Sequence, residues 1–382
     1  MSNNKVYIDF HVIQTVPPSC VNRDDTGSPK TAVYGGARRA RVSSQSWKRA
    51  MRVIFRENFD ESELAFRTKR IVELVANEIV ELSPDKSKEE AMTLANNAIN
   101  AAGVSTKESG VKGATKKVRD AKTLNAPQTM IDHEAKALFF MSKQQAKNLA
   151  SLASEKCTDK KVLQNALNRN HNAEIALFGR MVADDPSLNA DASAQVAHCI
   201  STHAVSSEYD YFTAMDDMKG EDEDAGAGML GTVEFNSATL YRYATLASHN
   251  LFEQLGNETG AFSKAVSEFA RAFVTAMPTG KQNTFANRTL PDVVMVHIRT
   301  DQPVNLAGAF ESPIKAARGE GYRDASVKAL REYADEVYAD FADKPAASYV
   351  IGAGLEGVGE KVSLEGLISV LAGKVQALLG EN

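Results

Sequence analysis

The sequence CVNRDDTGSPKTAVYGGARRARVSSQSWKRAMRVIFR, residues 20–56, decides how the fold opens. A Gly-Gly pair at 35–36 predicts a turn, because paired glycines accept positive φ angles without steric cost. After this turn Ser43 or Ser44 can cap a helix that begins near Gln45. The apolar residues of this helix recur at the spacing of one buried face, and they are Trp47, Ala50, Met51, Ile54 and Phe55.

The same segment is strongly cationic. It contains no acidic residue from Thr26 to Arg56, although the whole chain has a net charge of -5. Within the window from Thr26 to Arg56 the cations are Lys30, Arg38, Arg39, Arg41, Lys48, Arg49, Arg52 and Arg56. A glycine bend, hydroxyl groups, a capped helix start and a row of cations together predict a site for consecutive phosphates. The alternative is an ordinary solvated basic face of a helix.

Composition narrows the class of protein. A chain of 382 residues can hold two or three domains, or one domain with large insertions. A pI near 5.9 gives no global signal for nucleic acid, so any such binding must be local. Three cysteines without CxxC spacing suit a reducing cytosol and predict no zinc site. No apolar run of membrane or signal-peptide type is present, which predicts a soluble, cytoplasmic protein.

Residues 5–16 alternate in polarity and predict a half-buried strand before the amphipathic helix. Val6, Ile8, Phe10 and Val12 share one face of this strand, and Tyr7, Asp9 and His11 share the other. Asp9 and His11 lie two residues apart on the same face, so they could touch, which would suggest acid–base chemistry. Because no nucleophile accompanies them, a structural or solvated histidine is favoured.

Residues 60–180 are predicted to form a helical insertion, with apolar stripes along 71–79, 131–139 and 149–152. Within it, 106–122 is polar, contains glycine and is rich in lysine. This segment is either a solvated loop or a non-specific patch for the phosphates of a second strand. The adjacent Lys160 and Lys161, at a predicted helix start, leave the same two possibilities open.

Residues 202–236 predict a long hairpin, because two β-type segments flank an acidic, glycine-rich middle. Tyr211, Phe212 and Thr213 lie at its base. An aromatic ring can wedge into a stack of bases, recovering about 1–3 kcal/mol per base against an unstacking cost of a few kcal/mol. The alternative is that these aromatics belong to the core.

The order strand, helix, insertion, hairpin, helix and strand predicts an α+β fold that is RRM-like (ferredoxin-like) with inserted material. The second helix is predicted over 260–277 and the last strand over 292–299. Further helices are predicted around 325–342 and 364–379, packing on the core or on a neighbouring molecule.

Several sequence runs together resemble one known family. These are NRDD, YGG, SSQS and KRAMR in the opening segment, GRM at 179–181, AHCISTHAV at 197–205, DYFTAMDD at 210–217, GTVEF at 231–235 and LYRYA at 240–244. They are similar, in order and spacing, to the CasC family, the repeated backbone subunit of the type I-E CRISPR surveillance complex Cascade. The resemblance spans most of 5–300 and is weaker over 60–170 and after 300.

The resemblance implies an RRM-like palm over 1–58 and 181–382, with a thumb hairpin at about 202–236 and helical fingers over 59–180. It implies guide RNA (crRNA) contacts from Arg23, Lys30, Ser43, Gln45, Lys48, Arg49 and Arg52. It implies base displacement by Met181, Tyr211, Phe212 and Thr213, although Met181 could instead be a core residue. Possible contacts to target DNA are Lys112, Lys116, Lys117, Lys160 and Lys161. The implied partners are crRNA, target DNA, further copies in a head-to-tail filament, and the large, small and two end-capping Cascade subunits.

No catalytic motif is present: P-loop, HExxH, GxSxG and CxxC are all absent from the sequence. The enzymatic alternative is an RNA-processing endoribonuclease of the same superfamily, acting through His198 or His203. Metal-independent cleavage needs a cation beside the histidine, and 198–203 contains none. We therefore expect a non-catalytic protein with no cofactor and no metal.

Overall fold

The structure is a computed structural model that describes residues 5–109, 132–169, 171–214 and 229–380. Two compact units make up the chain. Unit 1 comprises Met1–Asn58, Ala194–Asn250 and Phe262–Asn382, and unit 2 comprises Phe59–Ser193 and Leu251–Ala261. The architecture is mixed α and β with a large sheet, as the α+β prediction requires. No helix of the described part has the length and apolar character needed to cross a membrane.

Unit 1 is organised by a ten-stranded sheet with the order β14-β13-β12-β1-β11-β9-β3-β2, to which β8 and β10 add by pairing with β11. Its strands are β1 (Tyr7–Ser19), β2 (Thr31–Tyr34), β3 (Ala37–Val42), β8 (Ala194–Val196), β9 (Cys199–Ser201), β10 (Glu208–Ala214), β11 (Met229–Ala247), β12 (Val293–Arg299), β13 (Ala347–Gly352) and β14 (Glu360–Lys361). Its helices are α1 (Ser44–Asn58), α9 (Gln282–Phe285), η4 (Leu306–Phe310), α10 (Arg323–Asp340) and α11 (Leu364–Gly380). Most of α8 (Thr259–Thr275) belongs to it, and α7 (Ser248–Gln254) crosses a unit boundary.

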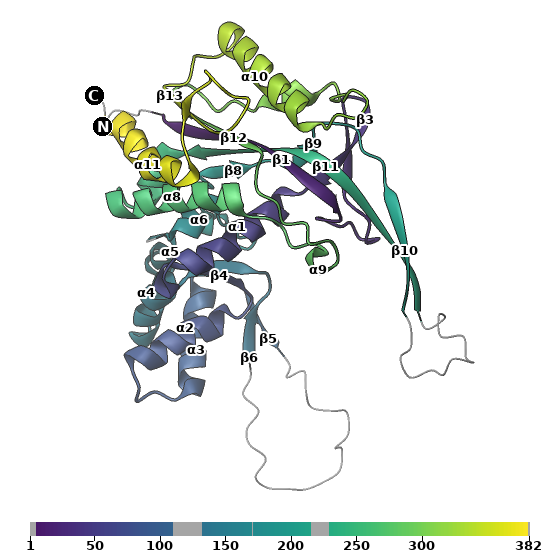
Figure 1. The fold of residues 1–382 in the computed structure, drawn as a ribbon. Coiled ribbons are helices and arrows are strands. Elements are labelled where there is room, and N and C mark those ends of the chain that lie inside the picture. The colour runs from purple at the N-terminus through teal and green to yellow at the C-terminus, as the bar shows by residue number, and fades with distance from the viewer. Residues whose placement is uncertain (1–4, 110–131, 170, 215–228, 381–382) are drawn as a thin grey trace, which may run out of the picture. The chain divides into compact units, whose positions relative to one another are not determined.

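Strand β1 lies at the centre of this sheet and is buried on both faces, so the prediction of a half-buried strand was wrong. On one face Phe10 packs against Phe269 and Phe273 of α8, with ring centroids 5.6 and 5.7 Å apart. On the other face Ile13 belongs to a core cluster with Leu330 and other residues of α10. Figure 1 shows α1 and α8 on one side of the sheet and α10 on the other. The second layer comes from the last third of the chain, which the spacing within residues 5–16 does not encode.

The opening segment forms the predicted turn and helix. Gly35 and Gly36 have φ angles of 55° and 71° and join β2 to β3 directly. The Ser43 side chain accepts a hydrogen bond from the backbone N–H of Ser46 at 3.3 Å, which caps α1. The predicted helices near 260–277, 325–342 and 364–379 correspond to α8, α10 and α11.

A polar cluster is buried on the α10 face of the sheet. Asp9 accepts hydrogen bonds from the Tyr243 hydroxyl at 3.0 Å and from the backbone N–H of Val304 at 2.8 Å. Burial raises the pKa of Asp9 to about 6, because desolvation outweighs these bonds. Burial also lowers the pKa of His297 to about 3 and that of His11 well below its usual value. His11 is therefore structural and has no accessible acid–base role.

We predict that stability decreases in acid because of this cluster. Between about pH 4 and 6, His11 and His297 are protonated in the unfolded chain, whereas in the folded protein Asp9 is the member of this cluster that takes up a proton. The His297→Gln variant lacks one of the two histidines that take up a proton on unfolding. Its free energy of unfolding should therefore fall less steeply as the pH is lowered, by about 1.4 kcal/mol per pH unit. Urea unfolding of both proteins across this range measures the slopes. Equal slopes would contradict the assignment.

In its described residues, unit 2 is mainly helical, with two two-stranded sheets and two short 3₁₀ helices. Its elements are η1 (Glu61–Glu63), β4 (Ala65–Thr68), α2 (Ile71–Leu82), α3 (Lys88–Ala101), β5 (Thr106–Ser109), β6 (Asp132–Ala135), β7 (Phe139–Ser142), α4 (Lys143–Ser154), α5 (Lys160–Asn168), α6 (Ala173–Phe178) and η2 (Pro186–Leu188). The stripes at 71–79 and 149–152 belong to its core, as predicted. The helical interpretation of 131–139 was wrong, because β6 pairs with β5 and β7 pairs with β4.

Arg180 holds the end of unit 2 together. Its buried guanidinium donates hydrogen bonds to the carbonyl oxygens of Leu188 (2.8 Å) and Leu167 (3.1 Å) and to the Asn168 side chain (2.9 Å). The insertion is predicted over 59–180, and the compact unit runs on to Ser193. The buried guanidinium of Arg180 finds its partners on both sides of its own position in the chain, at 167–168 and at 188.

Candidate nucleic-acid interface

Helix α1 is fixed to the sheet by a buried cation, Arg242 of β11. The guanidinium carbon lies 3.8 Å from the centroid of the Trp47 ring and 4.8 Å from that of Phe273. Arg242 also donates to the Gln14 side chain at 2.6 Å and to the carbonyl oxygen of Phe273. Burial lowers the pKa of Arg242 to about 9, which still leaves it charged at neutral pH. One side chain therefore joins β11, β1, α1 and α8.

The outer side of α1 borders a cavity of about 680 Å³. Trp47, Met51 and Phe55 point into the core, as predicted. Ala50 and Ile54, predicted for the same buried face, are only half-buried and line the cavity instead. The remaining walls come from residues 21–27 and from the segment 276–288, which follows α8.

The loop at 21–27 is held in a defined conformation against the start of α1. The Asp24 carboxylate accepts hydrogen bonds from the hydroxyl of Thr26 (2.7 Å), from its backbone N–H (2.9 Å) and from the backbone N–H of Ser28 (3.0 Å). The bond from the Thr26 side chain is the main reason that the pKa of Asp24 is lowered. Asn22 accepts from the backbone N–H of Ser43 at 2.9 Å, which ties this loop to the helix cap.

The predicted phosphate ligands do not share one environment. Arg23 and Arg49 are exposed and line the cavity, and Gln45 is exposed at the first turn of α1. Lys30, Lys48 and Arg52 are half-buried, whereas Ser43 is buried and serves as the helix cap. Arg288, which sequence analysis missed, lines the same cavity as Arg23 and Arg49. Carboxylates of Asp24, Asp25 and Glu57 also line it, so its charge is mixed.

The predicted hairpin is present, and every residue of β10 is exposed. Figure 1 shows this ribbon projecting from the sheet of unit 1. Tyr211 and Thr213 lie on one face, with Tyr211 being 65% exposed. Phe212 lies on the opposite face, opposite Gly231, and an added Cβ there would be 2.5 Å from the Phe212 ring. The glycine therefore leaves room for the ring, which explains why Phe212 is only 36% exposed. The core interpretation of these aromatics was wrong.

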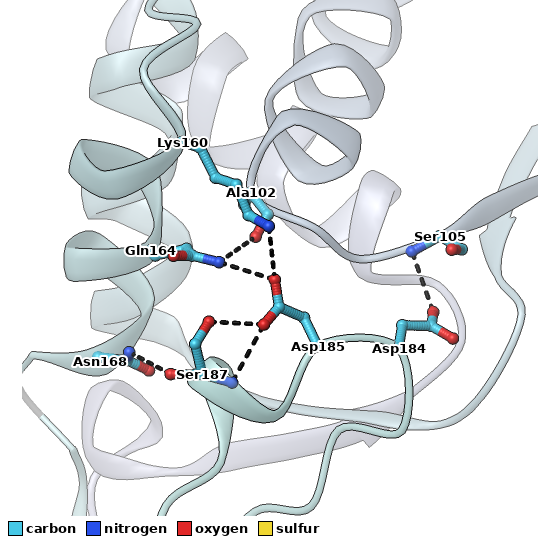
Figure 2. Close-up of polar contacts among 8 residues, drawn as sticks. All are labelled: Ala102, Ser105, Lys160, Gln164, Asn168, Asp184, Asp185 and Ser187. Carbon is cyan, nitrogen blue, oxygen red and sulfur yellow. Dashed lines mark hydrogen bonds and ion pairs between the residues drawn. The ribbon is translucent and has the colours of Figure 1, made fainter.

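Two predicted sites in unit 2 have contrasting surroundings. Met181 is 85% exposed, so it is not a core residue, and it follows directly on the buried Arg180. Lys160, a predicted DNA contact, forms an ion pair with Asp185 at 2.8 Å (Figure 2). Asp185 also accepts from Gln164 at 2.9 Å and from the hydroxyl of Ser187 at 2.6 Å. Lys160 thus has a structural role in fastening the 184–188 segment to α5.

The other predicted DNA contacts fall into two groups. Lys161 is exposed in the first turn of α5. Lys112, Lys116 and Lys117 lie outside the described residues, as does the acidic middle of the hairpin at 215–228. Strand β5 is formed by the first four residues of the lysine-rich segment 106–122, and it pairs with β6.

The two histidines of the enzymatic alternative differ sharply. His203 is buried and stacks on Tyr322 at 3.7 Å. Its Nε2 accepts from the backbone N–H of Thr239 (3.0 Å) and its Nδ1 donates to the carbonyl of Ala204 (2.9 Å), so both nitrogens are used. His198 is exposed and its Nδ1 lies 3.2 Å from the Arg41 guanidinium. Residues 198–203 themselves supply no cation, and the fold instead brings Arg41 to His198 from a distant strand.

The described ranges contain no cluster of side chains of the kind that binds a metal ion. No group of three or more His, Cys, Asp or Glu side chains there is arranged to hold a metal ion. The three cysteines are free.

Comparisons with known proteins now place the chain. The model of the CT1975-like protein family matches residues 8–369. The chain belongs to the CT1975-like family. A comparison with curated proteins gave no match.

Solved structures similar to this member of the CT1975-like family come from RNA-guided complexes. A chain of a "CRISPR RNA-guided surveillance complex, pre-nicking" is 32% identical, with a TM-score of 0.77, and the match covers 97% of this chain and 100% of that one. A chain of a "CRISPR RNA-guided surveillance complex" is 28% identical, with a TM-score of 0.68, over 96% and 99%. At this level the expected resemblance is confirmed: the matches support a Cascade-type CRISPR protein.

We predict that Trp47→Ala destabilises this CT1975-like protein by about 3–5 kcal/mol, because it leaves a cavity and removes the ring from a buried cation. Urea unfolding measures the change. Val53→Ala, at an exposed position of the same helix, is the control and should change stability by less than about 0.5 kcal/mol. A loss below about 1 kcal/mol for Trp47→Ala would show that α1 does not depend on this contact.

Proposed function

We propose that this protein is a guide-RNA-binding backbone subunit of a Cascade complex, of the type I-E CasC kind. The observation that carries the proposal is the presentation of Arg23 and Arg49 on a surface whose helix is anchored from below. Exposed cations on a rigid support bind phosphates without a large ordering cost. The similarity to chains of RNA-guided surveillance complexes, over nearly the whole length of both chains, supports the same function.

We infer that unit 1 is an RRM-like palm. The four central strands have the order β12-β1-β11-β9, and each pair of neighbours is antiparallel. Helix α1 follows β1, and α8 follows β11, on the same side of the sheet. This alternation is typical of the ferredoxin-like arrangement, with β10–β11 as a thumb and unit 2 as inserted fingers.

The proposed contacts are blind to base sequence. Arg23, Lys30, Gln45, Lys48, Arg49 and Arg52 would hold phosphates and sugars, while Ser43 acts indirectly by capping α1. Phosphate contacts fix the register of the strand, and base pairing by the guide then specifies the target DNA. Copies of the chain would assemble head to tail along crRNA, since one surface meets a different one on the next copy. The other Cascade subunits would set the length of this head-to-tail assembly.

The thumb would displace a base, with Met181 as a further contact. A flat, exposed hairpin with aromatics on both faces can present a ring to each side of a gap in a base stack. We propose Phe212 as the wedge, because its ring is held against Gly231. Tyr211 and Thr213, on the other face of the hairpin, would contact the RNA on that side.

Catalysis is not part of the proposal. His203 has both ring nitrogens in hydrogen bonds, and the accessible His198 has one nitrogen occupied by Arg41. An acid–base pair for RNA cleavage needs two groups that exchange protons on opposite sides of the scissile bond. His198 alone does not meet that need.

We predict that Arg23→Ala together with Arg49→Ala weakens binding of single-stranded RNA equally for every base sequence. Losing two phosphate contacts should make the plot of log K against log salt less steep, reducing the magnitude of its slope by about 1.4. Fluorescence anisotropy with several labelled RNAs over a range of salt measures both effects.

The matched control is Lys328→Ala with Arg331→Ala, two cations on α10 on the other side of the sheet, and it should bind as the wild type does. A loss restricted to some RNA sequences would argue against backbone binding. The same samples with magnesium are expected to leave the RNA intact, and specific cleavage would favour the endoribonuclease alternative.

We predict that Phe212→Ala changes base displacement more than affinity. Removing the ring should lower the chemical reactivity of the displaced guide bases, while affinity falls by less than about tenfold. Chemical probing of bound RNA measures this. Tyr209→Ala, at an exposed tyrosine further from the tip of the same strand, is the control. An unchanged probing pattern in Phe212→Ala would reject the wedge.

A further inference from the structure

A group of three basic side chains, the exposed His198 and the half-buried Arg41 and Lys30, lies beside the start of α1 and away from the guide contacts proposed on that helix. His198 follows β8, Arg41 belongs to β3 and Lys30 precedes β2. The pairing of Val42 with Cys199, carried one residue further, places His198 opposite Ser43, the cap of α1. The three groups are distant in sequence, and the sheet brings them together.

Arg41 fixes the chemical state of His198. The Nη1 of Arg41 lies 3.2 Å from Nδ1 of His198, and an arginine can only donate. Nδ1 therefore accepts, the ring is neutral, and Nε2 carries the hydrogen. Desolvation, followed by the charges of Arg41 and Lys30, lowers the pKa of His198, in agreement with a neutral ring.

Arg41 itself is held in place by the backbone. Its Nε donates to the carbonyl of Thr31 at 3.2 Å, and its backbone N–H donates to the carbonyl of Lys30 at 2.9 Å. The charged groups that act on the His198 ring, within the described part of the chain, are both cations. The group is thus oriented, partly exposed and without a neutralising carboxylate among the charges that act on the ring.

We propose that His198, Arg41 and Lys30 form one phosphodiester-binding site, in which neutral His198 donates from Nε2 and the two cations supply the charge. A phosphodiester shares one negative charge between two non-bridging oxygens, and these oxygens can accept from the imidazole N–H and from the two cations. The site rests on the proposed function, and it adds His198 and Arg41 to the surface that holds the guide backbone.

The test is RNA binding by the full chain at about pH 7.5, over roughly 50–200 mM salt. His198→Leu should weaken affinity by roughly five- to tenfold with no change in the salt slope, because it removes a neutral donor. Arg41→Gln should weaken affinity and also lower the slope by about 0.7. His198→Gln, which can accept from Arg41 and still donate, should retain most of the affinity.

Gln195→Leu on β8 is the matched control, since it removes an exposed polar side chain from the same sheet and should bind as the wild type does. Wild-type affinity in His198→Leu would overturn the site. A lower salt slope in His198→Leu would also overturn it, because that result requires a charged imidazole. Cleavage of the RNA that depends on His198 would replace binding with catalysis.

A second measurement needs no substitution. Carbethoxylation of wild-type protein, followed by peptide mass spectrometry, reports the accessibility of His198, and bound RNA is expected to protect it. Unchanged labelling in a sample whose anisotropy shows bound RNA would refute this site alone. A wild-type protein that binds no RNA would instead refute the proposed function, and this site with it.

Discussion

The contact between the Arg242 guanidinium and the Trp47 ring fixes helix α1 on the sheet, and the proposed RNA-binding surface depends on that position. A buried arginine is costly unless its hydrogen bonds are met and its charge has a favourable neighbour. Arg242 meets this need with Gln14, the carbonyl of Phe273 and two aromatic rings. Because these partners come from β1, α8 and α1, the cation determines where the cationic helix can lie.

The surface above this anchor combines two kinds of constraint. Arg23 and Arg49 are exposed, yet the backbone that carries them is fixed, by Asp24 within its loop and by Ser43 at the helix cap. The β10–β11 hairpin is different, since every residue of β10 is exposed and cross-strand pairs such as Phe212 with Gly231 shape the ribbon. A rigid cationic surface and a projecting aromatic ribbon suit the two parts of the proposed task, holding a backbone and displacing a base.

The basic residues of this protein differ in what they contact, so the presence of a positive charge does not by itself identify a binding residue. Lys160 and Arg180 are cations with structural roles, since one pairs with Asp185 and the other is buried among carbonyl groups. His198 has no charge of its own, yet it is exposed and the charges of Arg41 and Lys30 act on its ring. Proteins of the CT1975-like family should therefore be compared by the partners of each basic side chain as well as by its presence.

The sequence by itself determined the local features. The glycine pair, the Ser43 cap, the face of Trp47, Met51 and Phe55, and the hairpin around residues 208–235 follow from short-range spacing and from the conformations that each residue permits. Only the tertiary structure decided the rest. Burial of β1 on its second face depends on α10, about three hundred residues later, and the pairing of His198 with Arg41 depends on the register of β3 with β9. These features depend on which distant segments pack together, and no periodicity within one segment records that choice.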